Sequence, residues 1–218
     1  MSVDLALERE LLDAGALRVI GIDEVGRGAL AGPVSVAAVA VEMRTPDPPP
    51  GLDDSKKLSA KRRAALLERI TTWAVAYSVI HVPAARIDDV GIMTALGEGA
   101  HAALVSLNDG VGEVRKPVNG DDAVLLDGKH DFLTPVCADH RVRMVVGGDG
   151  TCASIAAASI VAKHARDALM RDLHKDFAVY EWNRNVGYGT AAHRRAIDMH
   201  GASRYHRHSW RLTSTPGG

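Results

Sequence analysis

Cysteine and long hydrophobic runs are scarce in this chain of 218 residues. The two cysteines, Cys137 and Cys152, have no CxxC or CxxH spacing around them, so neither a disulfide framework nor a structural zinc site is expected. A reducing compartment is the simpler interpretation, and we predict a cytoplasmic protein. The uncharged run at 30–41 is interrupted by Gly32 and Pro33 and is too short to span a bilayer.

The pattern of a secretory signal is also missing, because residues 1–13 carry four acids and no basic segment followed by an apolar one. We therefore expect no association with a membrane. Hydrophobic residues make up 46% of the chain and charged residues 24%. This balance excludes a disordered chain, and the length suffices to bury a core without disulfides or structural metal.

Net charge argues at first against a nucleic-acid partner, because 26 basic and 27 acidic residues leave a formal charge of −1. The distribution of charge indicates the opposite. Residues 183–218 contain six arginines, four histidines and only one acid. A segregated basic surface matters more for a polyanionic partner than the total charge does. Charge alone fits a solvated helix face equally well.

Hydrophobic patterning predicts strands that alternate with helices. The predicted strands cover residues 17–22, 33–41, 73–82, 123–126 and 142–146. The predicted helices cover residues 59–70, 87–107, 154–175 and 191–200. Loops are expected at the proline-rich segment 45–51 and at the polar segment 108–120. This order of elements is typical of an α/β or mixed-sheet domain with a helical C-terminal extension.

Acidic residues stand at the ends of three predicted strands. Asp23 and Glu24 close the first strand, Asp127 closes the fourth, and Asp149 follows the fifth. Sites in α/β sheets gather at strand ends, so these acids form one centre if the fold places the strands side by side. A single aspartate at a strand end usually caps a turn, and spacing alone does not decide between the two interpretations.

Four carboxylates in one place would raise one another's pKa, and bound hard cations would relieve the repulsion. Ligands that are all oxygen favour Mg²⁺ or Mn²⁺ over Zn²⁺. Two such ions, roughly 3.5–4 Å apart, suit in-line displacement at phosphorus. Adjacent residues on a strand point to opposite faces, so Glu24 can join Asp23 only where the strand is already breaking. The glycines at 26 and 28 favour such a break.

Five motifs, in order, resemble those of bacterial ribonuclease HII, the type 2 ribonuclease H. The resemblance extends from about Val19 to Trp210. The motifs are Gly21-Ile22-Asp23-Glu24-Val25-Gly26-Arg27-Gly28, Asp53-Asp54-Ser55-Lys56-Lys57-Leu58, Leu126-Asp127-Gly128, Gly148-Asp149 with Ile155 to Asp167 after it, and Gly187-Tyr188 with the later His206-Arg207-His208-Ser209-Trp210.

The resemblance implies a ribonuclease H-like fold, in which helices flank a five-stranded mixed sheet. We expect a catalytic domain at 17–175 and a helical extension at 176–218 that packs on it and contributes to substrate binding. The implied enzyme is an endonuclease that hydrolyses the RNA strand of RNA–DNA hybrids by two-metal in-line hydrolysis. It would also cut 5′ of single ribonucleotides in duplex DNA, leaving 3′-hydroxyl and 5′-phosphate ends. The resemblance also implies roles in ribonucleotide excision repair and RNA primer removal. We expect a monomer with no protein partner.

Carried over by position, the resemblance implies that Asp23, Glu24, Asp127 and Asp149 are catalytic acids that bind two Mg²⁺ or Mn²⁺ ions. The implied substrate-binding residues are Gly26, Arg27, Gly28, Ser55, Lys56, Lys57 and Tyr188. Glycines allow a nucleic-acid backbone to approach main-chain N–H groups, and the 2′-hydroxyl marks a ribonucleotide whatever its base. Without the resemblance, residues 55–57 would be interpreted as a capped helix start and Tyr188 as a half-buried aromatic beside a turn.

Six positions depart from the family's pattern, among them Ala29 in place of a frequent proline and Gly91 in place of a frequent asparagine. Gly147 stands where the family often has a lysine, so a positive charge near the acids is either missing or supplied from elsewhere. Asn185, Val186 and Gly189 belong to a loop that in the family often reads His-Lys-Gly-Tyr-Pro, which puts its rigidity and its grip on phosphate in question. Two other functions stay open: a DNA nuclease or resolvase on the same fold, and a non-catalytic nucleic-acid-binding protein.

Overall fold

A five-stranded sheet forms the centre of the computed structural model, which describes residues 3–107 and 118–213. The strands are β1 (Val19–Val25), β2 (Val34–Val41), β3 (Ala76–Val82), β4 (Ala123–Asp127) and β5 (Arg141–Val145). Their order in the sheet is β3-β2-β1-β4-β5. The first three strands pair antiparallel, whereas β4 and β5 run parallel to β1. The predicted mixed sheet is thus confirmed.

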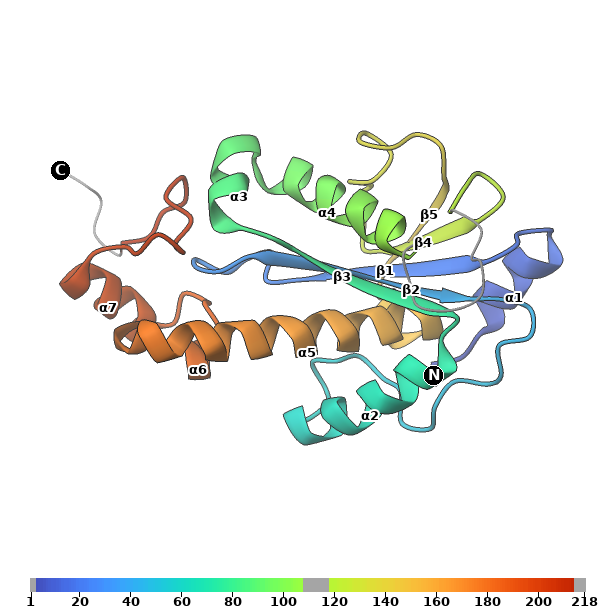
Figure 1. The fold of residues 1–218 in the computed structure, drawn as a ribbon, viewed down its shortest axis with the longest axis horizontal. Coiled ribbons are helices and arrows are strands. Elements are labelled where there is room, and N and C mark those ends of the chain that lie inside the picture. Colours follow the sequence, from blue (N-terminus) through green and yellow to red (C-terminus); the bar gives the residue numbers. More distant parts are fainter. Residues whose placement is uncertain (1–2, 108–117, 214–218) are drawn as a thin grey trace.

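Helices cover both faces of the sheet (Figure 1). One face carries α3 (Ala84–Val90) and α4 (Ile92–Ser106), and the other carries α2 (Ala60–Trp73) and the long α5 (Ala153–Asp176). Because both faces are covered, β2 is buried along its whole length and its sequence is almost entirely valine and alanine. In the part of the chain that is described, no helix is both long and apolar enough to cross a bilayer.

The C-terminal segment packs against the far end of α5. It contains the short helix α6 (Trp182–Asn185) and helix α7 (Ala191–His200), which Thr190 caps by accepting a hydrogen bond from the His193 N–H. Trp182 lies at the centre of a separate hydrophobic cluster, which also includes Leu30, Ala31, Met170, Tyr180 and Ile197. Since Leu30 and Ala31 follow β1, this cluster joins the C-terminal segment to the loop between β1 and β2.

Most predicted elements lie where the sequence placed them, with two informative shifts. Strand β1 continues to Val25 instead of ending at residue 22, because Asp23, Glu24 and Val25 keep pairing with β2. Strand β3 starts at Ala76, because helix α2 extends through Trp73. The sequence made no prediction for α1 (Ala6–Asp13), and residues 108–117 of the predicted polar loop lie outside the described residues.

Helix α5 lies unusually close to β1, and Gly21 makes this possible. A Cβ atom at Gly21 would stand 2.3 Å from the main-chain carbon of Ser154 and 2.4 Å from the nitrogen of Ile155. The helix offers a run of small residues, Ala156 to Ala158, to the same strand. Backbone atoms cannot move aside as a flexible side chain can, so this contact fixes the helix relative to the strand.

We therefore expect Gly21→Ala to lower the free energy of unfolding by about 2–4 kcal/mol, because α5 would have to shift away from β1. Urea denaturation followed by circular dichroism measures the loss. Gly120→Ala is the control, since a Cβ there would meet its nearest atom, the Asp139 carbonyl oxygen, only at 3.4 Å. A Gly21→Ala protein as stable as the control variant would contradict the close-packing argument.

Candidate metal centre

Three aspartates from different strand ends meet at one edge of the sheet. Strands β1 and β4 are parallel neighbours with Ile22 opposite Leu126, so Asp23 and Asp127 are each the next residue along. Asp149 lies in the 3₁₀ turn η1 (Gly148–Gly150) that follows β5. One carboxylate oxygen from each aspartate lies within 4.8 Å of the others. The fold therefore gathers side chains that are far apart in the sequence.

Burial makes this cluster unfavourable when it is ionised. Asp23 is only 5% exposed. Burial raises its pKa well above the usual value, and the nearby charges of Glu24 and Asp127 raise it further. Hydrogen bonds from the Ser159 side chain and the Glu24 N–H oppose this rise in the pKa of Asp23. Burial and the charge of Asp149 likewise raise the pKa of Asp127.

Glu24 was predicted as a fourth member of this centre, but the structure does not bring it into the group of three. Strand β1 still pairs at this residue, so Glu24 leaves the sheet on the face opposite to Asp23. Its carboxylate lies 3.5 Å from Arg27 Nη1. Burial raises the pKa of Glu24; the Arg27 charge opposes this rise, while the Asp127 charge adds to it. Glu24 is thus close enough for the charge of Asp127 to raise its pKa, but it is not one of the three clustered carboxylates.

The donor set fits a hard divalent cation. All three side chains supply carboxylate oxygen, and no other group of three possible ligands occurs within the described residues. A positive charge is already present beside the cluster, because Lys56 Nζ lies 3.1 Å from Asp149 Oδ2. Lys56 therefore supplies the charge that Gly147 lacks. Its side chain is 73% exposed, so it can move aside when a cation or phosphate approaches.

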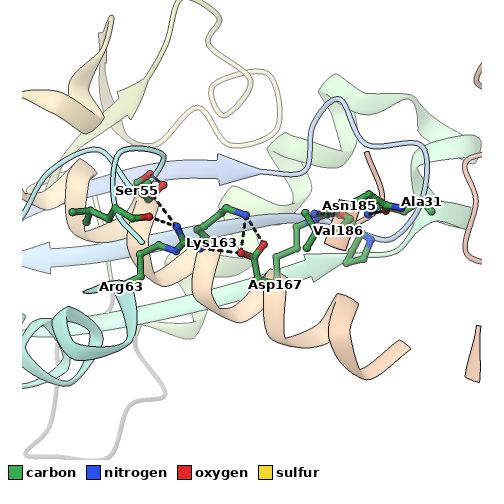
Figure 2. A network of polar contacts seen from close by, with 12 residues as sticks. Ala31, Ser55, Arg63, Lys163, Asp167, Asn185 and Val186 are labelled. Atoms are coloured by element: carbon green, nitrogen blue, oxygen red, sulfur yellow. Dashed lines mark hydrogen bonds and ion pairs between the residues drawn. The ribbon is translucent and has the colours of Figure 1, made fainter. Parts of the chain in front are cut away.

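The loop that carries Lys56 is held to α5 by polar contacts, drawn in Figure 2. Ser55 is 2% exposed, and its hydroxyl lies 2.8 Å from the hydroxyl of Ser159, the partner of Asp23. Arg63 donates to the Ser55 carbonyl and pairs with Asp167 on the helix. Ser55, predicted as a substrate contact, thus lies in the interior beneath the loop. Lys57 instead pairs with Asp53 at the surface.

The glycine-rich loop after β1 has one buried and one open glycine. Gly26 has a φ of 84°, and a Cβ atom there would stand 2.1 Å from Arg166 Nε, so a larger residue would not fit. Gly28 is exposed, and nothing lies within 4 Å of the place its Cβ would take. Arg27 between them contacts Glu24 and Met93. Main-chain atoms at Gly28 are therefore accessible to a ligand.

Tyr188, the last predicted substrate contact, is 37% exposed in a loop that packs on the glycine-rich segment. The Gly187 carbonyl accepts hydrogen bonds from the N–H groups of Leu30 and Ala31. Asn185 orders the loop from inside: its Nδ2 donates to the Tyr180 carbonyl, and its Oδ1 accepts from the Gly187 N–H. The departures from the family's loop sequence therefore leave a loop that is well hydrogen-bonded.

Several residues of this surface were interpreted differently from sequence. Arg207 was counted in the basic surface, but it is fully buried, as is Arg166. For Lys163 the sequence did not decide between phosphate and an acid, and in the structure it pairs with Asp167. No sequence signal separates a buried arginine from a surface one. The exposed arginines of the C-terminal segment are Arg184, Arg195, Arg204 and Arg211.

In the absence of divalent cations, Asp23→Asn should raise the free energy of unfolding by about 1 kcal/mol or more at pH 7.5. The raised pKa means that ionised Asp23 destabilises the folded state above its unfolded pKa. The gain should shrink as the pH falls through the unfolded-state pKa of about 4 and vanish near about pH 3, where Asp23 is protonated in both states. Thermal unfolding by calorimetry across this pH range measures the effect.

Asp131→Asn is the matched control, because this substitution should change the free energy of unfolding in the opposite direction. Hydrogen bonds from Thr134 and Leu133 lower the pKa of Asp131, although partial burial opposes them. Its carboxylate therefore stabilises the fold above the unfolded pKa, and its removal should lower the melting temperature at pH 7.5. If both variants lowered the melting temperature by the same amount, the electrostatic account of the Asp23 cluster would be refuted.

Comparison with known proteins connects this geometry to a family. The family model described as Ribonuclease HII matches residues 20–213. The ribonuclease HII of Streptomyces avermitilis is 42% identical over 205 residues, which cover 94% of this chain and 82% of that protein. The fold is similar to that of ribonuclease H2 from Pyrococcus horikoshii OT3, with a TM-score of 0.70 at 22% identity, covering 89% of this chain and 94% of that one.

A second similar structure is Bst-RNase HIII in complex with Mn²⁺, with a TM-score of 0.67 at 22% identity. The match covers 95% of this chain and 71% of that one. Family model, sequence identity and fold agree over nearly the whole chain. The chain belongs to the ribonuclease HII family, metal-dependent ribonucleases H that hydrolyse the RNA strand of RNA–DNA hybrids.

Proposed function

We propose that this protein cuts 5′ of single ribonucleotides embedded in duplex DNA, as well as within RNA–DNA hybrids, and leaves 3′-hydroxyl and 5′-phosphate ends. The observation that carries the proposal is the meeting of Asp23, Asp127 and Asp149 at one sheet edge, with oxygens within 4.8 Å of one another. Beside it stands an open glycine-rich loop suited to a nucleic-acid backbone.

In this proposal Asp23, Asp127 and Asp149 hold the metal ions, and Glu24 contributes from the adjoining face of β1. Two bound Mg²⁺ or Mn²⁺ ions would activate water and stabilise the leaving oxygen. The similar Bst-RNase HIII was solved with Mn²⁺, which is consistent with either ion. Ser159 orients Asp23, while Lys56 keeps a positive charge beside Asp149 for the incoming phosphodiester.

Selectivity for ribonucleotides is assigned to the loop from Gly26 to Gly28 and to Tyr188. Main-chain N–H groups at an open glycine can bind a phosphate and a 2′-hydroxyl without regard to the base. The exposed Tyr188 ring can pack on a sugar or base. Lys57 and the Ser55 loop complete the substrate surface, Lys57 by contacting phosphate and Ser55 by holding the loop on α5.

The same proposal sets the biological context. The described residues of a single chain supply the whole acid cluster, which supports action as a monomer. We assign catalysis to residues 17–175 and a share of duplex binding to 176–218. A protein that removes ribonucleotides from DNA and degrades RNA primers would work in the cytoplasm of a bacterial cell.

Cleavage mapping tests this proposal directly. With Mg²⁺ or Mn²⁺, an end-labelled duplex containing one ribonucleotide should be cut once, on its 5′ side, and chelator should abolish the cut. Asp23→Asn and Asp149→Asn should lower kcat by at least about a thousandfold, because each removes a charged ligand, with little loss of duplex binding. Asp139→Asn, an exposed aspartate away from the cluster, should keep wild-type kcat.

Each alternative predicts a different gel. Equal cleavage of an all-DNA duplex would indicate a DNA nuclease or resolvase. Metal-independent binding without cleavage of any substrate would indicate a binding protein. Full activity of Asp23→Asn would show that the acids are assigned wrongly.

Duplex binding should weaken steeply with salt if the C-terminal arginines contact phosphates. Arg195 is exposed on α7 and makes no ion pair within the described chain. Arg195→Ala should therefore lower the slope of log K against log salt by about 0.9. Fluorescence anisotropy without divalent cation measures it, with Arg9→Ala as a control that leaves the slope unchanged. An unchanged slope for Arg195→Ala would exclude this contact.

A further inference from the structure

A buried arginine joins the C-terminal segment to the adjacent glycine-rich loop. Arg207 is 0% exposed. Its Nη2 donates to the Gly26 carbonyl at 2.6 Å, and its Nη1 donates to the Arg27 carbonyl at 2.7 Å. Longer bonds of 3.3 and 3.4 Å reach the Gly32 carbonyl. The guanidinium thus grips three main-chain carbonyls of one loop.

Peptide planarity gives this grip a consequence for the outer surface of the loop. In a trans peptide, the carbonyl and the N–H of the next residue point in opposite directions. Because Arg207 holds the carbonyls of Gly26 and Arg27 inward, the N–H groups of Arg27 and Gly28 point away from it. Neither N–H donates a hydrogen bond to another group in the described chain. Two unused donors therefore face the open side of the loop.

The charge beneath these donors is positive, and the acids that offset it, Asp167 for Arg166 and Asp88 for Arg207, form no direct ion pair with it in the described chain. Arg166 lies beside Arg207, is also fully buried, and donates to the carbonyls of Pro33, Val186 and Ala31. Neither guanidinium forms an ion pair with a described carboxylate. Burial, together with the Arg166 charge, lowers the pKa of Arg207 to about 10, so Arg207 stays protonated at neutral pH.

We propose that Arg207 is the positioning residue of the substrate loop, holding it so that the Arg27 and Gly28 N–H groups point at a ribonucleotide and its phosphate. Two buried cations beneath outward-facing donors favour an anion at this place. Arg207 itself is buried and acts only through the loop. The inference rests on the proposed function, because it takes this loop as the reader of the ribonucleotide.

Arg207→Lys tests the inference, because lysine keeps the charge but cannot hold two carbonyls in one planar fork. For a duplex with one ribonucleotide, KM should rise on the order of tenfold while kcat at saturation stays within about twofold. The Kd measured without divalent cation should rise for this duplex but not for an all-DNA duplex of the same sequence. A merely structural defect would lower the folded fraction, and hence kcat, at unchanged KM.

Arg18→Lys is the matched control. Arg18 is another poorly exposed arginine that makes a two-pronged contact, to Asp122 at 2.9 and 2.7 Å, and it immediately precedes β1. Its replacement should reduce stability in a similar way and leave KM and the Kd ratio of the two duplexes unchanged. The comparison separates the general effect of losing a buried two-pronged arginine contact from the specific effect of changing the conformation of the glycine-rich loop.

Two results would overturn the inference. One is a folded Arg207→Lys protein whose KM and Kd ratio stay within twofold of wild type. If circular dichroism shows that this variant does not fold, Trp210→Leu decides, because the Arg207 guanidinium lies 4.7 Å from the Trp210 ring centre and loses that support. An unchanged KM in Trp210→Leu is the second such result. Wild-type protein that fails to cut the ribonucleotide duplex would instead refute the proposed function.

Discussion

Repulsion among three partly desolvated carboxylates is the interaction around which this structure is organised. Asp23, Asp127 and Asp149 are held together because β1 lies between β2 and β4, and because η1 follows β5 directly. Burial and like charge both disfavour ionisation at Asp23. The packing of the sheet holds the three carboxylates together despite their repulsion. A bound cation would relieve that repulsion and so stabilise the fold. The metal requirement of the family is thus a consequence of the electrostatics of the sheet edge.

Positive charge takes two forms, one beside the acid cluster and one beneath the glycine-rich loop. Lys56 is exposed and pairs with Asp149 at the surface of the cluster. Arg166 and Arg207 are buried, and each donates hydrogen bonds to main-chain carbonyls. A mobile lysine acts as a point charge, whereas a planar arginine fork fixes geometry. The charge beside Asp149 is therefore on an exposed side chain, while the shape of the glycine-rich loop is set by buried contacts.

Helices and strands with regular hydrophobic spacing, bounded by glycine, proline or polar residues, could be predicted from the sequence. Helix α7 was predicted near residues 191–200, and the structure places it at Ala191–His200 between the Thr190 cap and Gly201. The end of β1 was not, because Asp23 and Glu24 are polar although they still pair with β2. Strand alternation made the place of Glu24 depend on a break after Asp23, which the glycines at 26 and 28 favoured; β1 instead keeps pairing with β2 through Val25. The interior place of Ser55 and the burial of Arg207 depend on contacts over 104 and about 180 residues, which no local pattern encodes.

Helix α5 sets the spacing between the acid cluster and the substrate loop. Ser159 contacts Asp23, and Arg166, seven residues later, contacts the loop, so both lie on one face, two turns and about 10 Å apart. Figure 2 shows this span, with Ser55 at one end of the network and Ala31 and Val186 at the other. The segment between them contains neither glycine nor proline, so the helix has no natural hinge there. Gly21 allows the start of the same helix to pack directly on β1, so one helix fixes the acid cluster and the glycine-rich loop relative to each other.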